Sequence, residues 1–130
     1  MKKYYLIIFA FIFWIACDNE VTTPKLVGKW QLKTVEKNGI ETLVDTVWYN
    51  FQSESVFSIQ VYIPQQDTVL MLLGFKTEKD KVLSIKLESE AHLEHSDWSG
   101  TERMFSIEKV NKKNLQLRSE EGYNYSFIKF

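Results

Sequence analysis

Leu26-Val27-Gly28-Lys29-Trp30-Gln31-Leu32 is the stretch that decides the fold. Within it Trp30 and Leu32 share one face, which Thr34 continues, while the residues between them are polar. Apolar and polar residues that alternate in this way are typical of a strand with one buried face. The Asn38-Gly39 pair that follows is a strong signal for a two-residue hairpin turn. The stretch therefore predicts a first β-strand that ends in a tight turn.

The rest of the chain carries further segments of the same kind. The clearest is residues 57–63, where every second residue is large and apolar. Short turn signals separate the segments and no long helix is indicated, which favours an antiparallel sandwich or barrel. The eight expected strands lie near residues 26–34, 47–51, 57–63, 68–75, 83–87, 105–107, 115–117 and 123–130.

Residues 68–75 are unusual because both faces are apolar from Val69 to Leu73. A central helix is an alternative, but no capping residue stands at either end, so we favour a strand. A free apolar edge strand invites aggregation, and closure into a barrel removes that hazard. The outer face of this strand is then expected to meet a partner, a lid or the membrane.

Gly28-Lys29-Trp30, at the start of the first strand, resembles the Gly-x-Trp signature of lipocalins. Residues 26–130 as a whole resemble the small lipocalin-like domains of bacterial lipoproteins, which end in an aromatic-rich strand, here Tyr125 to Phe130. The resemblance implies an all-β fold, an eight-stranded antiparallel up-and-down barrel. It also implies that Trp30 closes one end of the barrel beneath a basic residue, for which Lys129 is the candidate. A plain core tryptophan is the alternative.

The chain begins with Lys2 and Lys3, and an uncharged apolar run follows from Tyr4 to Ala16. This run is shorter than the roughly 20 residues that span a bilayer as a helix. A positive start followed by a short apolar run is the layout of a secretory signal peptide. The alternative is a short buried helix at the front of the domain. We predict that this segment is an N-terminal signal peptide.

Trp14-Ile15-Ala16-Cys17, at the end of that run, resembles a bacterial lipobox. The resemblance implies cleavage before Cys17, a diacylglycerol on its sulfur, and a further acyl chain such as palmitate on its amine. Stable anchoring needs more than one acyl chain, which this arrangement supplies. The expected organisation is a signal peptide at 1–16, the lipidated cysteine and a short tether at 17–25, and a lipocalin-like barrel at 26–130.

The expected location is the cell envelope, reached by export and held by the lipid on Cys17. The outer membrane is favoured, on either its periplasmic side or the cell surface. Asp18-Asn19-Glu20 resembles acidic signals for surface display, but it also resembles the aspartate that retains lipoproteins at the inner membrane. Both destinations therefore stay open.

Composition narrows the classes of function. Without residues 1–16 the chain has 14 Lys and Arg against 17 Asp and Glu, a net charge near −3. No basic stripe is present, so nucleic acid is not an expected partner. Cys17 is the one cysteine, so no disulfide within the chain is available. The core must therefore come from packing alone.

No motif indicates catalysis or a cofactor. His92 and His95 lie near several carboxylates, but a zinc site generally needs three or four convergent ligands. The chain contains no Gly-x-Ser-x-Gly, no phosphate-binding glycine loop and no His-Glu-x-x-His. We predict a protein that is not an enzyme, with no metal and no cofactor.

Two functions compete. The leading hypothesis is a membrane-anchored barrel that binds a small apolar ligand, with residues 88–101 as a lid or mouth loop. The alternative is a filled barrel that binds an envelope protein, as an accessory or inhibitor lipoprotein, through Trp48, Tyr62 and one face of Val69–Leu73. A Tyr49 or Tyr125 hydroxyl without a protein partner would favour the first. The candidate ligand-lining residues are Tyr49, Phe57, Ile59, Val61, Ile85, Phe105, Ile107, Tyr125 and Phe127.

Overall fold

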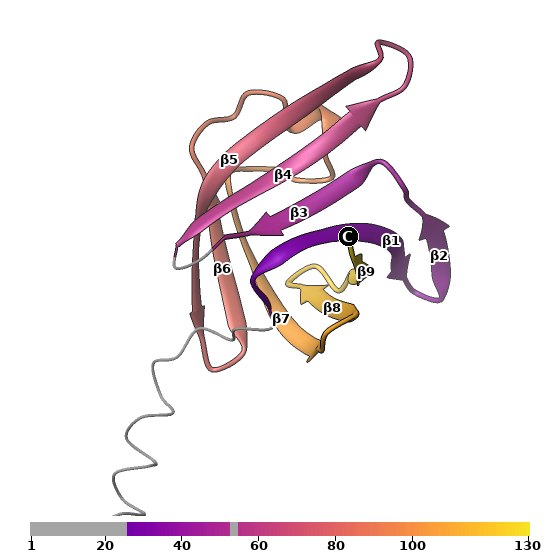
Figure 1. Cartoon of the computed structure of the whole chain (residues 1–130). Helices are drawn as coiled ribbons and strands as arrows, with labels where there is room; N and C mark the ends of the chain where they lie inside the picture. Colours follow the sequence, from indigo (N-terminus) through magenta and orange to yellow (C-terminus); the bar gives the residue numbers. More distant parts are fainter. Residues whose placement is uncertain (1–25, 53–54) are drawn as a thin grey trace, which may run out of the picture.

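A computed structural model of the chain describes residues 26–52 and 55–130. Within them nine strands form one antiparallel sheet that curls round on itself (Figure 1). No helix in this described part is long and apolar enough to cross a bilayer. The strands are β1 (Gly28–Lys37), β2 (Ile40–Leu43), β3 (Val47–Phe51), β4 (Val56–Ile63), β5 (Thr68–Lys79), β6 (Val82–Leu87), β7 (Glu102–Val110), β8 (Asn114–Ser119) and β9 (Asn124–Lys129), with a short helix η2 (Leu93–His95) before β7.

The sheet closes because β1 pairs with β9 as well as with β2 and β3. One edge of β1 pairs with β9. The other edge pairs with β3 along its first half and with β2 along its second half, so β2 and β3 together take the place of a single neighbouring strand. The closed ring of the described residues therefore has eight members, β1 and β3 to β9. This confirms the predicted eight-stranded antiparallel barrel, while β2, whose residues are all exposed, was not predicted.

The first hairpin forms where the sequence indicates it. Asn38 and Gly39 both have positive φ, 55° and 80°, and Lys37 pairs with Ile40 across them. Two consecutive positive-φ residues give the turn whose twist matches that of antiparallel strands. The predicted two-residue turn is confirmed.

One residue of the first strand faces the opposite way from the prediction. Leu32 pairs with Phe127 and Val35 pairs with Tyr125, whereas Thr34 pairs with Ser126 on the outer side. A β-bulge between Leu32 and Thr34 adds a residue to β1 and reverses the alternation beyond it. Val35, not Thr34, therefore packs against the core.

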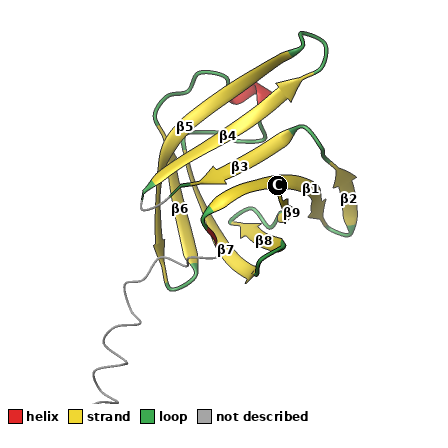
Figure 2. Cartoon of the chain, in the orientation of Figure 1, coloured by secondary structure: helices red, strands yellow, loops and turns green. Residues whose placement is uncertain are grey.

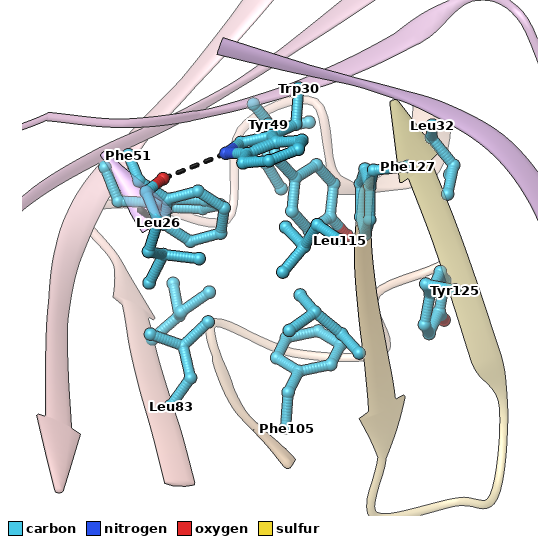
Figure 3. Packing of buried hydrophobic residues seen from close by; sticks show 14 of the residues in the cluster. Leu26, Trp30, Leu32, Tyr49, Phe51, Leu83, Phe105, Leu115, Tyr125 and Phe127 are labelled. Carbon is cyan, nitrogen blue, oxygen red and sulfur yellow. Dashed lines mark hydrogen bonds between the residues drawn. The ribbon is translucent and has the colours of Figure 1, made fainter. Parts of the chain in front are cut away.

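Trp30 and Lys129 lie together at one end of the barrel. Trp30 is fully buried, and its Nε1 donates a hydrogen bond of 2.9 Å to the Leu26 carbonyl (Figure 3). The Lys129 Nζ lies 4.6 Å from the centre of the Trp30 ring and donates to the Val27 carbonyl at 2.7 Å. Gly28, at φ 134°, leaves room for this ammonium, since a Cβ there would lie 2.0 Å from Nζ. One basic side chain thus covers the closed end.

Aromatic rings fill the interior next to this end (Figure 3). The Tyr49 ring lies among four phenylalanines, with centroid distances of 4.9 Å to Phe127, 5.4 Å to Phe57, 6.4 Å to Phe51 and 6.5 Å to Phe105. Edge-to-face and tilted contacts of this kind add stability beyond area burial, and each ring removes roughly 150–250 Å² from water. Ring packing therefore supplies the core in this part of the chain.

β5 confirms the strand that was favoured for residues 68–75. Its inner side buries Leu72, while four apolar residues on its outer side stay about half exposed, at 47–56%. We call these four the outer stripe: Val69, Met71, Leu73 and Phe75. Of the two apolar faces of β5, one therefore lies in the core and the other lies on the surface.

Replacing Trp30 with alanine should lower the free energy of unfolding of residues 18–130 by about 3–5 kcal/mol, because a fully buried ring leaves a cavity. Chemical denaturation measures the change. Leu43→Ala is the control, since Leu43 is 81% exposed and should change stability by no more than about 0.5 kcal/mol. Equal stability of the Trp30 variant and the native domain would contradict the closed-end packing.

Candidate functional site

The opposite end of the barrel is covered by the connection between β6 and β7, the segment expected to be a lid. Figure 2 shows this connection and its short helix η2 (Leu93–His95) at the end of the barrel away from the first residues of β1. The segment folds inward after η2, and Trp98 is only 5% exposed although its neighbours Asp97 and Ser99 are exposed. We call residues 88–101 the lid.

Trp98 enters the mouth of the barrel. Its Nε1 donates a hydrogen bond of 3.1 Å to the Tyr49 hydroxyl, which lies on β3. Its ring lies 6.0 Å from that of Phe105, measured between centroids. The indole thus has both its polar atom and its face satisfied by groups inside the barrel, so the lid holds the mouth closed.

Arg103, the second residue of β7, points inward beside Trp98 with a side chain only 5% exposed. Its Nη1 donates to Asp97 at 3.2 Å, and its Nη2 donates to Glu121 at 3.3 Å and to the Tyr125 hydroxyl. The guanidinium also lies 5.5 Å from the Trp98 ring centre and 5.1 Å from that of Tyr125. A buried charge is tolerated only with such partners.

The partners of Arg103 are also linked to each other. Tyr125 donates a short hydrogen bond to the second carboxylate oxygen of Asp97. The Arg103 Nε, by contrast, is buried and has no hydrogen-bond partner among the described residues. Since a buried donor left unpaired costs stability, this atom marks a place where the site is not yet fully satisfied.

The electrostatics keep this cluster in one charge state. Burial alone would lower the pKa of Arg103, but the charge of Asp97 and the hydrogen bond to Tyr125 raise it above its ordinary value. Burial raises the pKa of Tyr49 and of Tyr125, and for Tyr125 the hydrogen bond to Asp97 raises it further. Near neutral pH the mouth therefore holds a permanent cation and two neutral phenols.

A small apolar pocket of about 150 Å³ lies directly beneath the lid. Its walls are mainly aliphatic and come from β1, β3, β4 and Val44, and lid residues 95–98 form one side of it. Tyr49 is the one ring of the filled interior that reaches it. The lining residues are Leu32, Val35, Val44, Val47, Tyr49, Ile59, Val61 and His95 to Trp98.

Of the nine residues proposed to contact a ligand, all are buried, but only Tyr49, Ile59 and Val61 line this pocket. The other six belong to the filled core or to the Arg103 cluster: Phe57, Ile85, Phe105, Ile107, Tyr125 and Phe127. Trp30 and Lys129 lie together at the closed end, as described above. Cys17 lies outside the described residues.

Several residues of the mouth were not predicted. Arg103 alternates with Phe105 and Ile107 on β7, so the period-two pattern alone would have placed it inside. The burial of Trp98 has no such signal, because it lies in irregular backbone. Val35 was hidden by the bulge in β1. The Tyr49 hydroxyl accepts a hydrogen bond from Trp98, and the Tyr125 hydroxyl bonds to Asp97 and Arg103. The unpartnered hydroxyl that would favour ligand binding is therefore not found at either tyrosine.

His92 and His95 lie near each other on the lid, with ring centroids 6.5 Å apart. Among the described residues no group of three or more histidine, cysteine or acidic side chains is arranged to hold a metal ion. The site geometry offers a cation and two phenols near an apolar pocket.

The described residues thus form a closed eight-stranded antiparallel barrel with Trp30 and Lys129 at one end and a pocket at the other. A family model described as a lipocalin-like domain matches residues 9–130, so the chain belongs to the lipocalin-like domain family. No curated protein matches the chain.

Solved structures agree with this assignment. The chain is similar to a lipocalin-like protein from Bacteroides uniformis, with 28% identity, a TM-score of 0.73, and coverage of 82% of this chain and 99% of the other. It is also similar to an uncharacterized protein from Bacteroides eggerthii, with 27% identity, a TM-score of 0.70, and coverage of 81% and 99%.

Proposed function

We propose that this protein is a binding protein that takes up a small apolar ligand at the mouth of its barrel. The observation that carries the proposal is the apolar pocket under a lid held by hydrogen bonds. Typical ligand sites have about 300–1,000 Å³, so a pocket of about 150 Å³ suits either a very small ligand or a site that enlarges when the lid moves. No enzymatic step is proposed.

We further propose that the protein is a lipoprotein of the cell envelope. The support is the sequence alone: the two-lysine start, the apolar run of residues 4–16, and the lipobox-like Trp14 to Cys17. In this proposal residues 1–16 are removed, the lipid on Cys17 anchors the chain to the outer membrane, and residues 18–25 tether the barrel close to the lipid surface.

Native mass spectrometry of residues 18–130, exposed to a lipid extract of the bacterial envelope, should show a discrete added mass. Val47→Asp should reduce the bound fraction at least about tenfold, because it places a carboxylate in the apolar wall of the pocket. Ile40→Asp is the matched control: Ile40 is 72% exposed on β2, outside the ring, and the added mass should persist. A ligand that binds the Val47 variant equally well would contradict the mouth site.

Cys17→Ala should abolish incorporation of labelled palmitate and release the protein from the membrane fraction, because the acyl chains supply the anchor. Metabolic labelling followed by cell fractionation measures both. Thr23→Ala, which changes the tether and keeps the cysteine, should stay labelled and membrane-bound. Normal labelling of the Cys17 variant would remove the lipoprotein proposal.

The outer stripe favours a second candidate function, a non-enzymatic module that binds an envelope protein. Next to the stripe an open hollow of about 440 Å³ is bordered by Phe75, Ser84 and Met104. Of the other outward residues named from the sequence, Trp48 packs against Phe130 and Tyr62 bonds to Asp67, which leaves the stripe as the main apolar surface of this set. If native mass spectrometry shows a stably folded domain with no added mass after exposure to any lipid fraction, the result would favour this function over ligand binding.

A further inference from the structure

Two consecutive lid residues present the mouth of the barrel with an anion and an apolar ring. The Asp97 carboxylate bonds to Arg103 and to Tyr125, while the Trp98 ring packs against Phe105 and bonds to Tyr49. Each group therefore uses a different part of the mouth. Together they resemble, in chemistry, one amphipathic molecule with a carboxylate head and an apolar body.

Arg103 lies on a strand, whereas its two anionic partners lie in segments that connect strands. It lies on β7, where it pairs with Ile85 of β6, and its side chain is 5% exposed. Asp97 lies in the lid and Glu121 in the turn between β8 and β9, with side chains 50% and 46% exposed. If the lid withdraws, the guanidinium stays in the mouth and loses one of its two carboxylates.

A buried guanidinium with one carboxylate removed needs a replacement anion. Breaking a buried pair by removing one partner is strongly destabilising, because it leaves an uncompensated charge. The Arg103 Nε already lacks a partner, so a planar carboxylate that reaches Nε as well as an Nη would satisfy one more donor than Asp97 does.

Withdrawal of the lid also creates the space for an apolar body. Lid residues 95–98 form one wall of the 150 Å³ pocket, and the other walls are Tyr49 and aliphatic side chains, most of them on β1, β3 and β4. Removal of the indole therefore joins its own volume to the pocket. Because Asp97 and Trp98 also contact Arg103, their withdrawal exposes the guanidinium on the side where the pocket lies.

We propose that Asp97 and Trp98 occupy the ligand site as a built-in plug, and that the ligand is an amphipathic monocarboxylate that displaces them. Its carboxylate takes the place of Asp97 on Arg103 and Tyr125, and its apolar body takes the place of the Trp98 ring and extends into the pocket. This inference rests on the proposed ligand-binding function and names the ligand class. A neutral apolar molecule of the same shape leaves Arg103 without its second anion and binds more weakly.

Calorimetric titration of residues 18–130 tests the plug with 2-naphthylacetate and its neutral isostere 2-naphthylacetamide. The ring closes and the core is buried between Leu26 and Lys129, so this part of the chain is expected to fold alone. The acid should bind at least about tenfold more tightly than the amide, since it forms charge-assisted hydrogen bonds.

Variants separate the two halves of the plug. Trp98→Ala should raise the affinity for both compounds at least about threefold and keep the preference for the acid. Asp97→Asn should raise the affinity for the acid, because a competing carboxylate is gone. Arg103→Gln should remove the preference for the acid. Lys109→Gln, which removes an exposed cation from the same strand, is the charge-matched control and should behave like the native protein.

The outcomes distinguish this inference from the proposed function. If acid and amide bind equally to the native protein and to the Asp97 variant, the carboxylate class is wrong while apolar binding stands. If neither compound binds to the native protein or to the Trp98 variant, ligand binding at the mouth fails as well. Should the Arg103 variant not fold, the Asp97 and Trp98 variants decide: unchanged affinities for the acid in both would overturn the plug.

Discussion

The pairing of β1 with β9 is the constraint on which the rest of the described structure depends. It turns a nine-stranded sheet into a closed ring, so the apolar inner faces meet each other instead of water. Closure also leaves no free edge in the ring, which matters for a chain whose β5 is apolar on both faces. Trp30 and Lys129, which are paired across these two strands, seal the end where the ring would otherwise open.

Closure at one end confines any ligand chemistry to the other. The rings around Tyr49 fill the interior beside the closed end, and the pocket that Tyr49 lines lies under the lid. Arg103 is buried, and the low dielectric around it makes its hydrogen bonds and ion pairs stronger than they would be in water. The same low dielectric makes the loss of its hydration costly. In the proposed binding function, Arg103 on β7 therefore selects for the charge of the ligand, while the aliphatic wall selects for an apolar body.

Much of the fold could be predicted from the sequence, because inward and outward residues alternate along each strand. The strand at residues 57–63, the turn at Asn38-Gly39 and the pairing of Trp30 with a basic residue near the end all follow from local pattern or from family resemblance. The bulge after Leu32 does not, since an extra residue in one strand is defined only by its partner, and one such shift reverses the faces of Thr34 and Val35.

The mouth was harder to predict than the barrel. The bonds of Trp98 to Tyr49 and of Asp97 to Tyr125 join an irregular segment to strands 49 and 28 residues away, and no local signal encodes such pairings. Arg103 was missed for a different reason. The alternation on β7 places it inside, but a charged residue is ordinarily expected to face solvent. Exceptions of this kind are common where binding groups are needed inside a core.

Exchange of the Trp98 indole proton with solvent, followed by NMR with and without 2-naphthylacetate, tests the plug most directly. In the free protein this proton should be protected by its bond to Tyr49, and the Trp30 proton, bonded to the Leu26 carbonyl, is the internal reference. Bound carboxylate should expose the Trp98 proton to rapid exchange and leave the Trp30 proton unchanged. A Trp98 proton that stays equally protected while the acid is bound would contradict displacement of the lid.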